Sequence, residues 1–576
     1  MCGTKLPTVA PTPQRSEPTT STSGATSPMP KPQPDSSVRS EVARNRVPEA
    51  EGAILTNSVA LARKLHVERD TIVRLIEAYV VASHTRGIRY RVIDAADYRM
   101  LNPESATRSI SLTPADGWVE HTALLADYYR YGRLTTEDRS CYLFIIGGED
   151  IIPMPIVPHY MAATPNFHDK DIDSDIPYAY MLGERTYPLL ESGKLFSYEQ
   201  YFHVGRLPFA TDASIEDLAG YLRRASAAAA GIEVESYYGQ TNMPWGDESL
   251  VVCKPLRDAA IPTTSTEFEE AYCEVEGERY YVSNDGLIYS LPVNVHNLEQ
   301  VFDANASFYY FNLHGSNSPT YPGYIADHVG NAILPQHIAT TTKPNIFVTE
   351  ACYGGRFQRY AKRDSMLLSA MSSQTLLLLG SSRIAFCNNR YSIDNSDRLA
   401  NVFIVELLNG KSGGEALYNA RKSFFEYDNG RLYDQQLVSI VEFNLFGDPS
   451  LKMRRAKDSG YEGYRCAPLS KGEVIRVVEN KCLYEENEEQ NKGSILQLVR
   501  REVDQNIMRI RQVIDKELYD RLGVEHRALR NIFRSSFSDG RSFYSFNYSD
   551  QRAGFDRSYS ALTTEQGEII TVITTK

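Results

Sequence analysis

Two segments of the sequence place a reactive side chain directly after a run of apolar residues. His314 ends the segment FYYFNLH (308–314), and Cys352 follows the segment NIFVTEA (345–351). A cysteine thiol is mostly protonated at neutral pH, and a neighbouring imidazole can take up its proton and later return it to a leaving group. His314 and Cys352 therefore predict a nucleophile and its acid/base partner, which is the chemistry of covalent acyl transfer.

The residue after His314 is a glycine, Gly315, which leaves the backbone beside the pair without a side chain. Its N–H and that of Cys352 are predicted to point at the oxygen that gains negative charge during the reaction, forming an oxyanion hole. A lone Cys after an apolar strand is more often a buried structural thiol. The two motifs together favour a reactive site.

The elements that must position this pair appear as short apolar runs. Each run is closed by Gly, a polar residue or a reactive side chain, which is typical of buried parallel strands with functional loops at their carboxyl ends. Because neighbouring parallel strands end at the same edge of a sheet, His314 and Cys352 are expected to meet there. The strands predicted in this part of the chain are VVC (251–253), SFYYFNL (307–313), NIFVTEA (345–351) and TLLLLGS (375–381).

The preceding part of the chain also mixes helical and strand patterns. A helical pattern from Glu51 to Tyr79 comes before the strand-like run 88–94, and the Ala-rich segment 214–230 is expected to be a helix. Further strands are predicted at 141–148 and 201–208. This alternation indicates an α/β fold with a mostly parallel sheet.

At 576 residues the chain is long enough for several domains. Its Pro-, Ser- and Thr-rich start cannot bury enough apolar surface to offset chain entropy, and is expected to be disordered. Its end combines an amphipathic helix over 494–522 with a strand over 568–575. The expected units are a tether (1–45), an N-terminal α/β subdomain (46–232), a second α/β subdomain that carries the site (233–455) and a small C-terminal α+β domain of unassigned role (456–576).

Composition and charge exclude several classes of function. The net charge is -12 and the 61 Lys and Arg residues are scattered, so nucleic acid is not an expected partner. No apolar stretch approaches the roughly 20 residues that span a bilayer, and no transmembrane segment is expected. The eight cysteines include no CxxC pair, which favours chemistry without a metal.

At this point the sequence resembles the gingipain family, cysteine peptidases of the caspase-like clan, in which a His-Gly and an Ala-Cys each follow a core strand. His314-Gly315 and Ala351-Cys352 match that pattern. Four accompanying stretches also match, in the family's order. They are FIIGGEDIIPMP (144–155), SDIPYAY (174–180), HVGRLPF (203–209) and NLFGDPSLKM (444–453).

The resemblance implies two caspase-like α/β subdomains, His314 as acid/base, Cys352 as nucleophile, and proteins or peptides as substrates. Gingipains also orient the histidine with one acidic residue and bind a basic P1 side chain through another, both on a loop that falls near residues 239–249 here. Asp247 and Glu248 are the acids available on that loop. A preference for Arg or Lys at P1 is a hypothesis based on those two residues.

The resemblance also implies calcium as a structural ion. Asp169, Asp171, Asp173 and Asp175 offer oxygen ligands at alternate positions, although the run lacks the Gly and the distal Glu of a calcium loop. A solvated acidic loop is the competing interpretation. No cofactor is expected to be required for catalysis.

The first residues suggest a location. Cys2 directly precedes the tether, as in a bacterial lipoprotein without its signal peptide, and a lipid on Cys2 would place the protein in the cell envelope. An ordinary Cys after the start Met is the alternative. We therefore expect a secreted or envelope-anchored endopeptidase that is made as a zymogen. Two alternatives are a cytoplasmic caspase-like protease and an inactive adaptor or binding module.

Overall fold

The protein is described from a computed structural model of the whole chain. The described residues are 51–103, 108–132, 141–158, 170–181, 183, 195, 200–242, 246–265, 302–318, 321–326, 330–388, 393–426, 431–432, 434–455, 473–474, 477–485, 510–516, 528–537, 542–550, 557–564 and 569–575.

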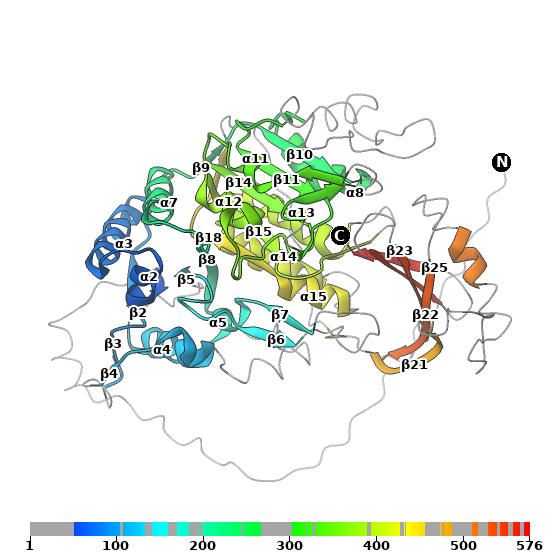
Figure 1. The fold of residues 1–576 in the computed structure, drawn as a ribbon, viewed down its shortest axis with the longest axis horizontal. Coiled ribbons are helices and arrows are strands. Elements are labelled where there is room, and N and C mark those ends of the chain that lie inside the picture. Colours follow the sequence, from blue (N-terminus) through cyan, green and yellow to red (C-terminus); the bar gives the residue numbers. More distant parts are fainter. Residues whose placement is uncertain are drawn as a thin grey trace, which may run out of the picture. The chain divides into compact units, whose positions relative to one another are not determined.

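A nine-stranded, mostly parallel sheet organises the described residues between 51 and 455 (Figure 1). Its strand order is β10-β11-β14-β15-β18-β8-β5-β1-β2, and only the β15–β18 pair is antiparallel. The strands are β1 Gly52–Thr56, β2 Tyr90–Asp94, β5 Cys141–Ile146, β8 Phe202–Leu207, β10 Tyr237–Thr241, β11 Phe308–Asn312, β14 Asn345–Thr349, β15 Thr375–Ser381 and β18 Phe443–Gly447.

Two groups of helices pack on this sheet. In the first group α3, α7, α12 and α11 contact one another in that order, and α7 and α12 contact β15. In the second, α13 contacts α8, α14 and α15, and α14 and α15 contact β18. The helices are α2 Ser58–Lys64, α3 Arg69–Ser83, α4 Gly117–Tyr131, α5 Ile176–Tyr180, α7 Ile215–Ala227, α8 Gly246–Asp258, α11 Pro335–Ile338, α12 Met366–Ser372, α13 Asn395–Leu408, α14 Gly413–Glu426 and α15 Asp434–Glu442.

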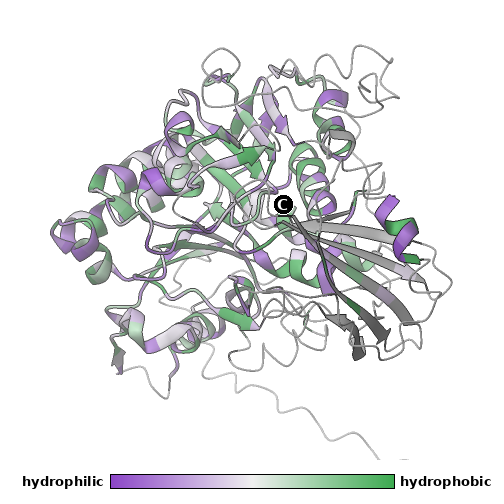
Figure 2. Cartoon of the chain, turned by 45° about the vertical axis from the view of Figure 1, so that its right-hand side comes forward, coloured by the Kyte–Doolittle hydropathy of each residue, from purple (hydrophilic) through white to green (hydrophobic). Residues whose placement is uncertain are grey.

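The strands that carry the predicted site are buried along their whole length. Every residue of β11, β14 and β15 is buried, as expected for parallel strands covered on both faces. In Figure 2 these central strands are largely hydrophobic, whereas the surrounding helices alternate hydrophobic and hydrophilic residues. Strands that are buried along their whole length therefore support the loops at the edge of the sheet.

A buried arginine joins three of the stretches that carry the family resemblance. Arg206 on β8 is fully buried, and its Nε and Nη2 donate to Asp175 at 2.9 and 2.6 Å. Its Nη1 donates to the carbonyl oxygens of Gly147 and Ile152 at 2.9 and 2.8 Å. Arg206 is also the β8 residue that pairs with Phe446 of β18. These stretches therefore hold the two halves of the sheet together.

Further strands lie outside the large sheet. A six-stranded antiparallel sheet has the order β16-β25-β24-β23-β22-β21, in which β16 comes from the loop after β15. Its strands are β16 Phe386–Asn388, β21 Val477–Glu485, β22 Ala528–Phe537, β23 Ser542–Asp550, β24 Arg557–Thr564 and β25 Ile569–Thr575. Two-stranded pairs are β3 Tyr98–Arg99 with β4 Ser109–Ile110, β6 Ile156–Pro158 with β7 Asp171–Asp173, β9 Ile232–Val234 with β19 Met453–Arg455, β12 Tyr324–Ala326 with β13 Gly330–Ile333, and β17 Arg431–Leu432 with β20 Glu473–Val474.

Most of the predicted elements are confirmed, with two corrections. VVC (251–253) is not a strand, because it lies inside α8; three apolar residues fit a buried helix as well as a strand. The helical pattern from Glu51 begins instead with β1, so Ile54 is a strand residue. Strands from both predicted α/β subdomains lie in one continuous sheet. Of the predicted helix 494–522, only residues 510–516 are described, and they are helical.

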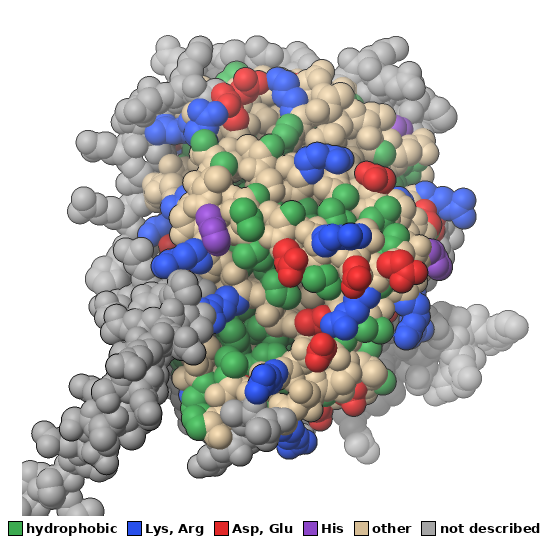
Figure 3. Space-filling model, turned by 90° about the vertical axis from the view of Figure 1, so that its left-hand side faces the viewer, with side chains coloured by type: hydrophobic (Ala, Val, Ile, Leu, Met, Phe, Trp, Pro, Cys, Tyr) green, Lys and Arg blue, Asp and Glu red, His purple; other side chains and the backbone are tan. Residues whose placement is uncertain are grey.

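The surface carries charges of both signs. Figure 3 shows one face on which Lys, Arg, Asp and Glu side chains are interspersed with small hydrophobic areas. Among the described residues, no helix is both long and apolar enough to cross a membrane.

Candidate active site

The first four strands of the large sheet end at one edge. β10, β11, β14 and β15 are parallel neighbours, so the residues that follow them lie side by side. Asn242 follows β10, His314 lies two residues beyond β11, and Cys352 lies three residues beyond β14. The sheet thus brings His314 and Cys352 to the same edge, as the sequence predicted.

His314 is fixed by its backbone and contacted by an amide. Its N–H donates to the carbonyl oxygen of Ile325 at 3.0 Å, and the Ile325 N–H donates back to His314 at 2.9 Å, which ties the loop to β12. Its side chain is only 3% exposed, and Asn242 Nδ2 lies 3.3 Å from its Nε2. Asn242 is itself buried, and its N–H donates to the Asn312 carbonyl oxygen at 2.8 Å. The ring is held from two neighbouring strand ends.

Cys352 lies at the start of a tight turn that is bonded to the loop after β15. Tyr353, the next residue, has φ of +56°, a left-handed conformation that non-glycine residues adopt rarely and that often marks functional sites. The Tyr353 N–H donates to the Arg383 carbonyl oxygen at 2.8 Å. Cys352 is 3% exposed, and its Sγ lies 3.8 Å from the Ala385 carbonyl oxygen. The turn therefore holds the thiol against residues 383–385.

The two sequence motifs touch through their backbones. A β-carbon built on Gly315 would lie 1.8 Å from the carbonyl oxygen of Cys352 and 3.1 Å from its amide nitrogen. No side chain fits at position 315 without displacing this backbone, which explains the glycine physically. Among the described residues, no hydrogen bond uses the Gly315 N–H.

A buried polar network lies behind these strand ends. Tyr310 donates to Glu350 at 2.7 Å, and both side chains are fully buried. Asn312 Nδ2 donates to Ser249 Oγ on α8 at 2.9 Å and lies 3.5 Å from Asp397 Oδ1 on α13. Burial and the neighbouring carboxylate of Glu350 raise the pKa of the Tyr310 hydroxyl well above its usual value. The network fixes the site's strands to the helices that cover them.

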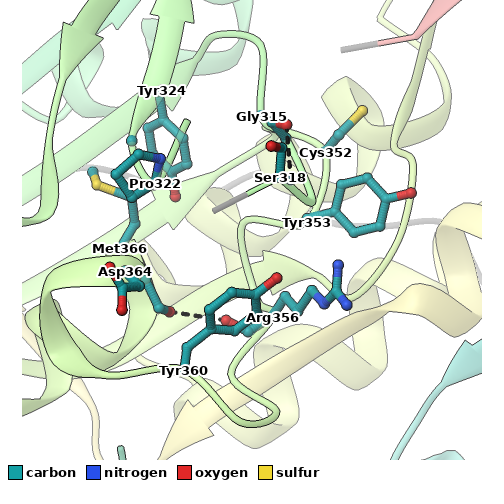
Figure 4. Close-up of a pocket in the computed structure, with 13 residues that line it drawn as sticks. Gly315, Ser318, Pro322, Tyr324, Cys352, Tyr353, Arg356, Tyr360, Asp364 and Met366 are labelled. Atoms are coloured by element: carbon teal, nitrogen blue, oxygen red, sulfur yellow. Dashed lines mark hydrogen bonds between the residues drawn. The ribbon is translucent and has the colours of Figure 1, made fainter. Parts of the chain in front are cut away.

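A pocket of about 350 Å³, counting the part open to solvent, lies beside Cys352 (Figure 4). Gly315 and Cys352 line one side of it, and Tyr353, Arg356 and Tyr360 line another. The two residues predicted to form the oxyanion hole therefore border this pocket.

The acids predicted to bind a basic P1 side chain are only partly described. Glu248 lies on α8 and is 6% exposed, whereas the side chain of Asp247 lies outside the described residues. The residue that contacts His314 is Asn242, which the sequence analysis did not single out. Its signal in the sequence was modest: a polar residue directly after YYGQT (237–241), a run without a clear apolar pattern.

Two of the acids in the run proposed for calcium, Asp173 and Asp175, are paired with arginines. Asp175 binds Arg206, and Asp173 lies 2.9 Å from Arg383. Asp169, like Cys2, lies outside the described residues. In the described part of the chain, no group of three His, Cys, Asp or Glu side chains is arranged to hold a metal ion. The described part of the run does not fit a calcium cage.

The buried, mostly parallel sheet places the protein among the α/β proteins, and the family that its sequence matches consists of cysteine-type endopeptidases. The profile described as "Peptidase family C25" matches residues 87–454, and the chain belongs to this family, the gingipain family. Among solved structures, one titled "Structure of Protease" aligns with 91% of this chain and 96% of its own at 9% identity and a TM-score of 0.40. No curated protein matches the sequence significantly.

Proposed function

We propose that the protein hydrolyses peptide bonds with Cys352 as nucleophile and His314 as acid/base. The observation that carries this assignment is the contact of Gly315 with the Cys352 backbone, because it brings both motifs to one point at the sheet edge. The N–H groups of Gly315 and Cys352 are proposed to form the oxyanion hole. The family supports the reaction class, and the geometry supports the choice of residues.

In this mechanism the Cys352 thiolate attacks the scissile carbonyl carbon, forming a C–S bond while the carbonyl electrons move to the oxygen. The two N–H groups stabilise that oxyanion. As the C–N bond breaks, the His314 imidazolium protonates the leaving amine. Water then attacks the thioester, His314 takes up its proton, and the C–S bond breaks to release the acid and the thiolate. Thiol, imidazole and backbone together account for every proton and charge, so no cofactor is required.

Asn242 is proposed as the residue that positions His314. Its amide contacts Nε2, and an amide there holds the ring through hydrogen bonding without adding a charge. Asn242 lies on the loop near residues 239–249, where the family resemblance implied an acidic residue that orients the histidine.

A preference for a basic P1 side chain stays part of the proposal. Glu248, at the start of α8, is the described acid among the two that motivated it. P1 residues of both charges must be compared, because Glu248 is buried and its carboxylate would have to face the bound substrate.

We further propose that the enzyme is made in a restrained form, consistent with a zymogen. β16 begins with the residue after Ala385, whose carbonyl oxygen contacts the Cys352 thiol. β25 pairs with β16, with Phe386 opposite Thr575 and Asn388 opposite Ile573. An extended substrate commonly binds by adding a strand to such an edge. Occupation of β16 by β25 supports a role for residues 456–576 in limiting access.

Three further points rest on the sequence alone and stay predictions. They are a lipid on Cys2 with a place in the bacterial envelope or outside the cell, a structural calcium ion, and the division of the chain at residues 45, 232 and 455. Mass spectrometry of the N-terminus from the native host tests the first, because diacylglycerol on Cys2 does not arise in the cytosol. Thermal unfolding with calcium and with a chelator tests the second.

The central experiment is cleavage of fluorogenic peptides with varied P1 residues by the wild type and by Cys352→Ala. The proposal expects turnover that the substitution abolishes while the unfolding temperature stays close to that of the wild type. Equal turnover by both proteins would exclude Cys352 as nucleophile, and no turnover by either, after the chain has been trimmed proteolytically, would favour the adaptor alternative.

A further inference from the structure

Arg356 is the one basic side chain that lines the pocket beside Cys352 among its described lining residues. It lies four residues after the thiol, in the loop that leads to α12, and is partly buried. Figure 4 shows its guanidinium below Tyr353 on the Cys352 side of the pocket, while Asp364 lies on the far side beyond Tyr360. In this view the guanidinium lies on the same side of the pocket as Cys352, and the Asp364 carboxylate lies on the opposite side.

The Arg356 guanidinium is held by aromatic rings. Its central carbon lies 5.5 Å from the ring centre of Tyr353 and 5.3 Å from that of Tyr360, within cation–π range of both. Its Nη1 reaches the carbonyl oxygen of Asn317 at 3.5 Å, and the Tyr360 hydroxyl donates to the same oxygen at 3.0 Å. Rings constrain the flat faces of a guanidinium and leave the N–H groups at its edge for a ligand.

The other basic residues of this loop each have a carboxylate neighbour. Arg359 lies 3.9 Å from Glu149, and Lys362 lies 3.0 Å from Asp217. Arg363 lies 3.7 Å from Asp364, so the acid on the far side of the pocket is paired with Arg363. Within the described residues, no carboxylate lies within ion-pair distance of Arg356. No carboxylate of the described residues therefore neutralises the charge of Arg356.

We propose that Arg356 binds a carboxylate of the substrate close to the scissile bond, so that the enzyme favours an acidic residue next to its cleavage site. A planar guanidinium donates two parallel hydrogen bonds to a carboxylate, which is stronger and more selective than binding an amide of the same shape. The carboxylate comes from an Asp or Glu side chain or from a peptide C-terminus. This inference rests on the proposed function, because it concerns the subsite beside the same thiol.

The test uses the full-length enzyme and quenched peptides with the best P1 residue held constant. Glu and Gln are exchanged, one position at a time, at the three positions on either side of the scissile bond other than P1. A further pair of peptides ends in a free or an amidated C-terminus just after that bond. We expect one position at which Glu raises kcat/KM over Gln on the order of 10- to 100-fold, the range of one charge-assisted hydrogen bond.

Two variants separate the subsite from general charge effects. Arg356→Gln should bring the Glu-to-Gln ratio at that position close to one, and Arg356→Lys should retain part of it. Arg359→Gln removes a charge three residues away whose side chain is 93% exposed, and should leave the ratio as in the wild type. A ratio that survives in Arg356→Gln, or falls equally in Arg359→Gln, would overturn the inference.

Failure of the subsite is distinguishable from failure of the proposed function. Cleavage without any acidic preference would leave the peptidase assignment standing and remove only the role of Arg356. Where turnover is absent, binding of the same labelled peptides to Cys352→Ala by fluorescence anisotropy still compares Glu with Gln. Equal affinities would overturn the inference, and a Glu preference lost in the double variant with Arg356→Gln would support it.

Discussion

The α-carbon of Gly315 packs against the carbonyl of Cys352 so closely that a β-carbon would lie 1.8 Å from its oxygen. The histidine and cysteine loops therefore pack against each other through their backbones, and the N–H groups proposed for the oxyanion hole belong to the two residues in contact. This packing is possible only because residue 315 is a glycine and has no side chain.

Gly315→Ala should reduce kcat by about 100-fold or more, the cost of losing one oxyanion donor. The new methyl group must push the two backbones apart, which also destabilises the fold by roughly 1–3 kcal/mol. Gly410→Ala is the control for loss of stability, because its positive φ (+79°) strains an alanine while a β-carbon there meets nothing within 4 Å. Turnover per folded molecule should fall only in the first variant; a similar loss in both would contradict the assignment.

Alkylation should distinguish Cys352 from the other described thiols. Burial and the charge of Glu350 raise the pKa of Cys253 well above its usual value, and burial raises that of Cys141 to about 12. An ordinary thiol is only a few per cent ionised at pH 7, so full ionisation of Cys352 would speed its alkylation by up to roughly 30-fold. Peptide mapping after brief iodoacetamide treatment should find Cys352 labelled first. Unchanged labelling in His314→Ala would show that the imidazole does not activate it.

Asn242 should act through His314 rather than on the substrate. Asn242→Ala is expected to lower kcat about tenfold or more with little change in KM, because the ring loses its orientation. Asn242→Asp should recover part of the activity and shift the alkaline limb of the pH profile upward, because a carboxylate stabilises the imidazolium form. A purely structural role would lower stability in both variants and leave the pH profile in place.

Pairing of β25 with β16 predicts a redox-controlled variant. The Cα register sets Thr574 opposite Cys387, a separation that suits a cross-strand disulfide. Oxidised Thr574→Cys should turn over a peptide several-fold more slowly than the reduced protein, since the bond prevents β25 from leaving β16. Thr574→Ser carries the same change of size without the sulfur and should not respond to dithiothreitol. Equal rates before and after reduction would rule out a restraint at this strand.

The sequence predicted the parts of the site that are local. His314 and Cys352 each follow a fully buried strand, and parallel strands must end at one edge, so their meeting followed from pattern and topology. Asn242 was missed because it contacts His314 across 72 positions, and its only local signal was a polar residue after a run without a clear apolar pattern. VVC was assigned wrongly because three apolar residues do not distinguish a strand from the buried side of α8.

The stretches that carry the family resemblance were informative about the family but not about the chemistry of the site. Arg206 and Asp175 form a buried ion pair that is joined by two hydrogen bonds. That arrangement joins β5, β8 and β18, and sequence alone does not show that two charges separated by 31 positions meet in the core. Such motifs stabilise the sheet that supports the loops of His314 and Cys352.

Acid should destabilise the protein through His203. Its ring lies against Tyr142 and Tyr418, and burial lowers its pKa to about 4, with Lys411 adding to the effect and Glu415 opposing it. A histidine in the unfolded chain takes up its proton near pH 6.5, so the unfolded state gains protons first as the pH falls. The stability that neutral His203 contributes is complete above pH 6.5 and is lost progressively down to about pH 4.

The wild type should therefore lose on the order of 3 kcal/mol of unfolding free energy over that window relative to His203→Gln, whose side chain does not titrate. Urea denaturation at pH 7.5, 5.5 and 4.5 measures the difference between the two proteins, and the carboxylates common to both cancel. At pH 7.5 the wild type should be the more stable, because its ring fills the space between the tyrosines. A difference that stays constant across the three pH values would mean that folding does not change the pKa of His203, and that its burial is not what depresses acid stability.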